Sequence, residues 1–174
     1  MKKEGRAMAE ERNGAAEYHA MFGQPTHDDR RLFEFLVVAV FQPGLSWKAA
    51  AGKIPVFERV FAGFDPAVVA GFDEETIEEI ERDPEMIRNP RKIRAIVTNA
   101  RAIVQLAPEF KNFADYWWSF APSTDNIVRG PVNGQAGLGA VVAKDMKKRG
   151  FTFVGPTTIE LMLVGTGVLQ HERD

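Results

Sequence analysis

Hydrophobic residues recur along most of the chain at helical spacing. Residues 91–106 carry apolar side chains three or four positions apart, which places them on one face of an α-helix. Residues 28–41 are almost entirely apolar after Arg31, which predicts a buried helix that ends before Pro43-Gly44. Residues 73–84 combine many charges with a narrow apolar stripe, which predicts a third, acidic helix.

Capping residues and helix breakers divide the rest of the chain into short helices. Ser46 and Asp65 are side chains that commonly start helices. Further helices are expected over residues 115–120, 141–149 and 157–169, and residues 122–139, rich in Gly, Pro, Ser and Asn, predict a loop. Only residues 151–154 alternate in the manner of a strand, and four residues are too few to build a sheet. The expected fold class is therefore all-α.

Length and composition are typical of one soluble globular domain, with 174 residues, 45% hydrophobic and 26% charged. We expect residues 17–174 to form this domain and residues 1–16 to form a flexible or helical N-terminal extension. The longest apolar run, residues 35–41, is too short to cross a bilayer, and no signal peptide is visible. These features suggest a cytoplasmic protein with no membrane partner, and we expect a monomer. The absence of cysteine excludes disulfides and thiolate metal sites.

Charge is distributed unevenly, although the net charge is only −2. Residues 73–85 hold eight carboxylates, residues 87–101 hold five basic side chains and no acid, and residues 144–149 form a second basic cluster. The acidic helix, the turn at residues 86–90 and the basic helix predict a helix–hairpin–helix. Its turn would present free backbone N–H groups and a positive dipole end to a phosphate. A solvated helix face and an ordinary helix–turn–helix packing unit remain alternatives.

Two longer segments carry a more specific resemblance. Residues 32–47 (LFEFLVVAVFQPGLSW) and 87–101 (IRNPRKIRAIVTNAR) resemble signature segments of the 3-methyladenine DNA glycosylase I family. Shorter matches follow in the same order, so that the resemblance spans roughly residues 18–171. It implies a helix–hairpin–helix DNA glycosylase fold and a monofunctional hydrolase without a cofactor. Its substrate would be double-stranded DNA with an alkylated base of the 3-methyladenine type, which is flipped out, cleaved from the sugar in base-excision repair and released as a free alkylated purine.

The resemblance also implies roles for individual residues. An aromatic box suits a cationic alkylated base through stacking and cation–π attraction, while plain core packing is the usual role of any single large aromatic. The substrate-binding residues that we expect are Tyr18, Phe22, Ala39, Phe41 and Trp47. The DNA-binding residues that we expect are Arg88, Asn89, Arg91, Lys92, Lys147, Lys148 and Arg149.

The chain departs from the family pattern at several positions. Ala39 stands where the family has a glutamate that reads the base. His19 and His171 fall near the histidines of the family's zinc clasp, but its two cysteines are missing, so we expect no metal. Glu160 is the only charge in the apolar segment 157–167 and is the candidate catalytic residue, with a structural partner or an exposed edge as alternatives.

Ala39 leaves three hypotheses open. The first is an active 3-methyladenine glycosylase. The second is a weakened or non-enzymatic homologue that binds DNA or lesions. The third is a glycosylase retuned to a different base, which a wider pocket at Ala39 would accept.

Overall fold

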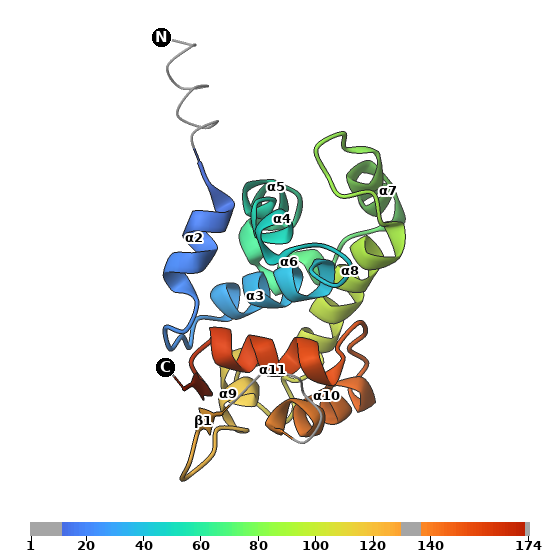
Figure 1. Ribbon diagram of the computed structural model, residues 1–174. Helices are drawn as coiled ribbons and strands as arrows, with labels where there is room; N and C mark the ends of the chain where they lie inside the picture. The colour runs from blue at the N-terminus through green and yellow to red at the C-terminus, as the bar shows by residue number, and fades with distance from the viewer. Residues whose placement is uncertain (1–11, 130–136, 173–174) are drawn as a thin grey trace.

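Residues 12–129 and 137–172 are described in the computed structural model, and within them helices follow one another through short connections (Figure 1). The helices are α2 (Gly14–Met21), α3 (Asp29–Phe41), α4 (Trp47–Ala51), α5 (Ile54–Val60), the 3-10 helix η1 (Ala62–Phe64), α6 (Pro66–Ala70), α7 (Glu74–Arg82), α8 (Pro90–Val104), α9 (Phe113–Trp118), α10 (Leu138–Lys148) and α11 (Pro156–Gly165). β1 (Ile127–Val128) pairs in parallel with β2 (Gln170–His171). The mostly helical fold is confirmed, with this two-residue ladder added.

The helices begin where the sequence supplies a cap. The side chains of Asp28, Ser46, Asp65 and Asp73 accept hydrogen bonds from the backbone N–H groups of the following turns. Such bonds satisfy donors that a helix start otherwise leaves unpaired. Because a cap is a local signal, the starts of α3, α4, α6 and α7 match the predicted positions.

α3 forms the centre of the core. Nine of the ten residues from Leu32 to Phe41 are buried, and the exception is Glu34. Figure 1 shows α3 crossing the middle of the molecule, with α4 to α6 on one side and α9 to α11 on the other, and α3 contacts α5, α8, α9 and α11. A helix that is apolar on all sides is therefore covered on all sides.

Several elements differ from the sequence-based expectation. α2 was not predicted. Tyr18 is the only large buried side chain in this helix, so its sequence has no regular spacing of apolar residues to detect. Residues 151–154 form no strand, since Phe153 has a left-handed backbone with φ 58°. α11 ends at Gly165, four residues early, because Gly167 reverses the chain with φ 83°. α10 begins at Leu138, inside the segment expected to be a loop.

Arg12 and Gly14, which belong to the expected N-terminal extension, contact the helices of the domain. Residues 1–11 of the expected extension fall outside the described residues. Arg12 forms ion pairs with Glu17 at 3.0 Å and with Glu58 of α5. Gly14 packs so closely on α4 that an added Cβ would lie 2.3 Å from the carbonyl oxygen of Ala51.

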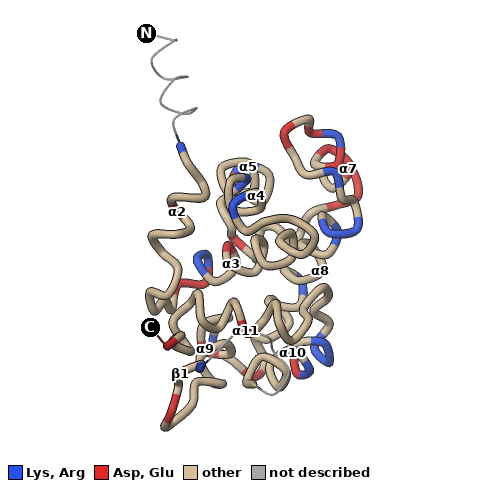
Figure 2. The backbone as a smooth tube through the Cα atoms, in the orientation of Figure 1, with Lys and Arg blue, Asp and Glu red and all other residues tan. Residues whose placement is uncertain are grey.

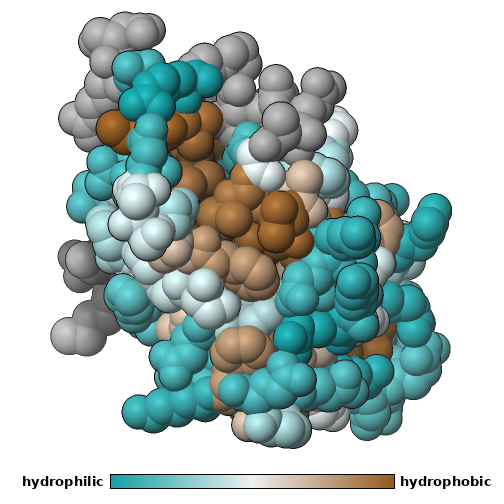
Figure 3. Space-filling model, turned by 90° about the horizontal axis from the view of Figure 1, so that it is seen from below, coloured by the Kyte–Doolittle hydropathy of each residue, from teal (hydrophilic) through white to brown (hydrophobic). Residues whose placement is uncertain are grey.

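The lower face of the molecule carries a hydrophobic area at its centre, surrounded by hydrophilic side chains (Figure 3). Ile127 of β1 and Val141 of α10 are exposed apolar side chains of the two elements that lie at this end in Figure 1. No helix among residues 12–129 and 137–172 is long and apolar enough to cross a membrane.

Candidate functional site: an aromatic pocket beside a helical hairpin

A pocket of about 360 Å³ lies between α2, the end of α3, the turn after α3 and the start of α11, and its volume falls within the range of small-molecule sites. A second pocket of about 150 Å³ adjoins it. Tyr18, Gln42 and Leu161 line both, so the two form one continuous site. The first is also lined by Phe35, Ala39, Pro43, Gly44, Leu45, Thr157, Thr158 and Met162, and the second by His19, Phe22 and Trp47.

Aromatic rings from three helices form the wall of this site. The ring centroid of Tyr18 lies 5.4 Å from that of Phe35, 5.6 Å from that of Phe22 and 6.1 Å from that of Trp47. Trp47 is partly exposed, and His19 stacks on it. Tyr18, Phe22 and Trp47 are therefore brought together as the sequence predicts, and their ring faces suit a flat, cationic ligand.

The hydroxyl of Tyr18 provides a hydrogen-bond donor in this wall. Burial raises the pKa of Tyr18 far above its ordinary value of 10.0, and the nearby charge of Glu34 raises the pKa further. The phenol is consequently neutral at physiological pH. It can donate a hydrogen bond to an acceptor atom of a ligand.

Ala39 and Gln42 occupy successive turns at the end of α3, and both line the larger pocket. Ala39 presents a methyl group, so it offers no hydrogen bond to a ligand. Gln42 does offer a polar group, and sequence reasoning missed it because it lies within the Gln-Pro-Gly turn that ends the helix. Its spacing of three residues from Ala39 was the available signal, since residues three apart share a helix face.

Phe41 is placed in the core rather than in the pocket. It is fully buried, it stacks on Phe57 with ring centroids 5.0 Å apart, and it is absent from the lining of both pockets. The expectation that Phe41 binds substrate is therefore corrected. Its position on α3, two residues past Ala39, turns it roughly 200° away around the helix.

Glu160 is also absent from the lining of both pockets, although Thr157 and Leu161 near it on α11 line the larger one. It is buried, and a Cβ added at Gly137 or Gly139 would overlap its side chain, so it packs against the first turn of α10. This placement gives no support to the predicted catalytic role. A carboxylate beside a helix N-terminus has a favourable electrostatic position there, which suits a structural role.

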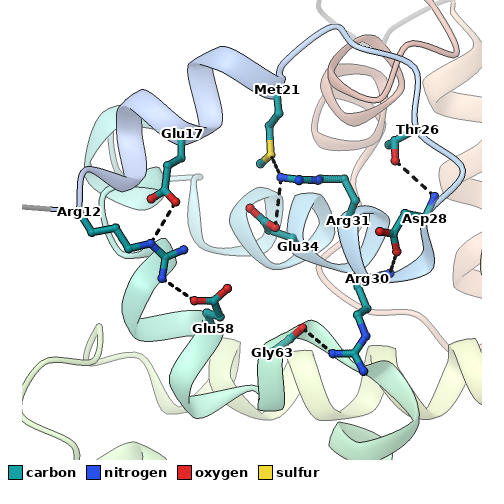
Figure 4. Close-up of polar contacts among 10 residues, drawn as sticks. All are labelled: Arg12, Glu17, Met21, Thr26, Asp28, Arg30, Arg31, Glu34, Glu58 and Gly63. Atoms are coloured by element: carbon teal, nitrogen blue, oxygen red, sulfur yellow. Dashed lines mark hydrogen bonds and ion pairs between the residues drawn. The ribbon is translucent and has the colours of Figure 1, made fainter. Parts of the chain in front are cut away.

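A group of charged side chains lies between α2, α3 and α5 (Figure 4). Glu34 is its most buried carboxylate, with 13% of the side chain exposed and the Nη1 of Arg31 at 3.7 Å. Burial raises the pKa of Glu34 to about 7, Arg31 opposes this rise, and Glu58 and Glu17 add to it. Glu34 is absent from the lining of both pockets, so it influences the site only through neighbours such as Tyr18.

The predicted helical hairpin is formed by α7 and α8, and several Lys and Arg residues lie in the chain around its turn (Figure 2). The side chain of Asn89 caps α8 by accepting a hydrogen bond from the backbone N–H of Lys92. Arg88 and Arg91 are exposed, and Arg91 lies 5.9 Å from the ring centroid of Phe153. A capped helix start with two exposed guanidinium groups is an arrangement that suits a phosphate.

Lys92 occupies a different place from the one expected of a DNA contact. Its ammonium group donates hydrogen bonds to the carbonyl oxygens of Phe41 at 3.4 Å and Pro43 at 2.8 Å. Burial lowers its pKa. Lys92 therefore joins the hairpin to the turn that borders the pocket, and a contact between Lys92 and DNA stays a prediction.

The second basic cluster separates into exposed and internally paired side chains. Lys147 and Lys148 are exposed at the end of α10. Arg149 instead forms ion pairs with Asp145 at 2.8 Å and Glu109 at 2.9 Å, and it lies over the rings of Phe110 and Tyr116. Lys147 and Lys148 therefore remain candidates for contact with DNA, whereas Arg149 mainly holds α10 in place.

The described part of the chain contains no cluster of three or more His, Asp or Glu side chains arranged to hold a metal ion. His19 lies against Trp47, and His171 lies in β2. The expectation that the protein needs no metal stays a prediction.

Comparisons with known proteins agree with this geometry. A family model described as methyladenine glycosylase matches residues 8–174. DNA-3-methyladenine glycosylase 1 of Escherichia coli is 32% identical over 152 residues, which cover 85% of this chain and 81% of that protein. DNA-3-methyladenine glycosylase of Haemophilus influenzae is 30% identical over 164 residues, which cover 91% and 89%.

Solved structures show the same fold. The 3-methyladenine DNA glycosylase I of Staphylococcus aureus superposes with a TM-score of 0.79 at 25% identity, covering 86% of this chain and 81% of that one. Another 3-methyladenine DNA glycosylase I superposes with a TM-score of 0.78 at 33% identity, covering 86% and 84%. The match over almost the whole length, in sequence and in fold, shows that the chain belongs to the methyladenine glycosylase family.

Proposed function

We propose that the protein is a DNA glycosylase that flips an alkylated base of the 3-methyladenine type out of double-stranded DNA and hydrolyses its N-glycosidic bond in base-excision repair. The observation that carries the proposal is the aromatic site formed by Tyr18, Phe22 and Trp47. Support also comes from a similar structure, at a TM-score of 0.79, that was solved in complex with 3-methyladenine. We also propose that the protein acts as a monomer in the cytoplasm.

The pocket chemistry fits a base that leaves easily. Methylation at N3 makes the attached adenine cationic, so cleavage of the bond to the sugar returns the bonding electrons to the ring and releases a neutral base. Water adds its oxygen to the sugar carbon and gives up a proton. Aromatic walls bind the flipped, cationic base through cation–π attraction. A leaving group that departs as a neutral molecule needs little protonation, so cleavage does not depend on a carboxylate at Ala39.

The surface beside the pocket fits a DNA backbone. Arg88 and Arg91 stand exposed at the start of α8, and Lys147 and Lys148 are exposed on α10. Lys92 connects the hairpin to the turn at Pro43 and Gly44, which lines the pocket. Phosphates bound at the hairpin would thus be held at a fixed distance from the flipped base.

Release of free base from methylated duplex DNA, measured by chromatography, tests the proposal. The parent is expected to release 3-methyladenine, and Trp47→Ala is expected to lose most of this activity while its thermal unfolding stays close to that of the parent. Binding of lesion DNA without release of any base would favour the non-enzymatic alternative that Ala39 raises. Release of another base from a mixed panel of lesions would favour a retuned specificity.

A further inference from the structure

Gln42 has an unusual hydrogen-bonding state at the boundary of the two pockets. Its backbone N–H donates to the carbonyl of Val38 at 2.9 Å, and its carbonyl accepts from the N–H of Leu45 at 2.8 Å. Its side-chain oxygen Oε1, in contrast, is buried and accepts no hydrogen bond from the described residues. A buried acceptor without a partner is costly, so such a group calls for an explanation such as a ligand that completes it.

The position of Gln42 points to a flipped base as the missing partner. Gln42 lines both pockets together with Tyr18, and it lies one helical turn beyond Ala39, on the same face of α3. Lys92 donates to the carbonyl oxygens of the residues on either side of it, Phe41 and Pro43. These hydrogen bonds fix the backbone on both sides of Gln42. The side-chain amide of Gln42 is then the polar group that can still rotate to meet a ligand.

The amide has the chemistry to recognise adenine. A carboxamide presents one acceptor and one N–H₂ donor side by side, and adenine presents an N6 amino donor next to the N7 acceptor, so the two groups can form a paired set of hydrogen bonds. Methylation at N3 leaves this edge unchanged. Guanine offers two acceptors, O6 and N7, at the same edge, and against it Oε1 would remain unpaired.

We propose that Gln42 reads the flipped base in this protein, in place of a carboxylate at position 39, and that it selects adenine-type over guanine-type lesions. The inference rests on the proposed glycosylase function and adds the substrate class to it. Lys92 acts as a positioning residue for Gln42, since it touches only the neighbouring backbone.

The test compares Gln42→Met with the parent. Methionine keeps the length and flexibility of glutamine and removes both hydrogen-bonding groups. Gln105→Met is a matched control, because Gln105 is also the C-cap of a helix, α8, and is exposed away from both pockets. Dissociation constants for free 3-methyladenine and free 3-methylguanine are measured by calorimetry, and release of 3-methyladenine from methylated DNA is measured in parallel.

The parent and Gln105→Met are expected to prefer 3-methyladenine by roughly 5- to 150-fold, the discrimination typical of a paired set of hydrogen bonds to a base edge. Gln42→Met is expected to lose most of this preference. Its melting temperature should equal or exceed that of the parent, because the substitution removes an unpaired buried acceptor. A merely structural glutamine would show the opposite pattern, with lower stability and an unchanged preference.

Two results would overturn the inference in distinguishable ways. If Gln42→Met binds both bases with the preference of the parent, another group reads the base, while the glycosylase function stands. If the parent binds neither base and releases none from DNA, the proposed function fails, and the role of Gln42 fails with it.

Discussion

Replacement of Glu34 by glutamine should stabilise the protein at neutral and alkaline pH. Glu34 is 13% exposed, and its nearest cation, Arg31, lies 3.7 Å away, which is long for an ion pair that must offset burial. Glu58 and Glu17 add repulsion from α5 and α2 (Figure 4). The charged carboxylate is therefore held in an unfavourable place, and glutamine occupies the same space without the charge.

The magnitude follows from the pKa of Glu34, which burial raises from an ordinary 4.5 to about 7. At about 1.4 kcal/mol for each pH unit, this difference corresponds to roughly 3 kcal/mol. Because the folded-state pKa lies above the unfolded one, the stability that protonated Glu34 contributes is fully present below about pH 4.5 and is lost as the pH rises through 7. Above that pH, Glu34→Gln should exceed the parent by roughly 1–3 kcal/mol in the free energy of unfolding.

Urea denaturation at several pH values between 4.5 and 8 measures this difference. Glu78→Gln is the control, because Glu78 is an exposed carboxylate on α7. The gap between Glu34→Gln and the parent should widen with pH, whereas Glu78→Gln should follow the parent throughout. Parallel curves for Glu34→Gln and the parent across the whole range would refute the reasoning, because they would mean that Glu34 ionises in the folded state as easily as in the unfolded chain.

Four further changes test the site and the DNA surface. Trp47→Ala should weaken binding of free 3-methyladenine by roughly 1–3 kcal/mol in calorimetry, and unchanged binding would remove Trp47 from the pocket wall. Combined Arg88→Ala and Arg91→Ala should weaken DNA binding at all sequences and flatten its dependence on salt; an unaltered salt slope would mean that the hairpin is only structural. Lys92→Met should lower the melting temperature and reduce affinity for the free base, since the turn at the pocket loses its two hydrogen bonds; a loss confined to DNA affinity would contradict this. Ala39→Glu should bind 3-methyladenine more tightly than the parent, and equal or weaker binding by a folded variant would show a pocket rebuilt around another group.

Local signals allowed much of the fold to be predicted. The caps at Asp28, Ser46 and Asp73 act within one turn, so the sequence contains the whole interaction. α2 escaped prediction because it is held by the close approach of Gly14 to α4, a contact between segments that are distant in sequence. The left-handed backbone of Phe153 depends likewise on distant contacts, among them the side chain of Asn99, which pairs with both backbone groups of Thr152.

The candidate site was predictable in its aromatic residues and less so in its polar ones. Tyr18 and Trp47 lie in segments that resemble the family, so their place followed from the resemblance. Phe41 packs against Phe57, and Glu160 packs against the start of α10, so neither side chain lines the pocket. When a helix is apolar on all sides, the sequence does not indicate which side faces the pocket. Gln42 was missed because the lack of a partner for its side-chain oxygen becomes visible only in the three-dimensional structure, where the distances to all nearby donors are known.

The tight contact between Gly14 and Ala51 also determines how the protein should respond to its chemical environment. Together with the ion pair of Arg12 and Glu58, it joins α2 to α4 and α5, and the β1–β2 ladder holds residues 170–171. These contacts are made by backbone packing, ion pairs and amide hydrogen bonds, and the chain has no cysteine. Chelators and reducing agents should therefore leave both contacts intact, whereas replacement of Gly14 by any larger residue should loosen α2 and, with it, the wall that carries Tyr18.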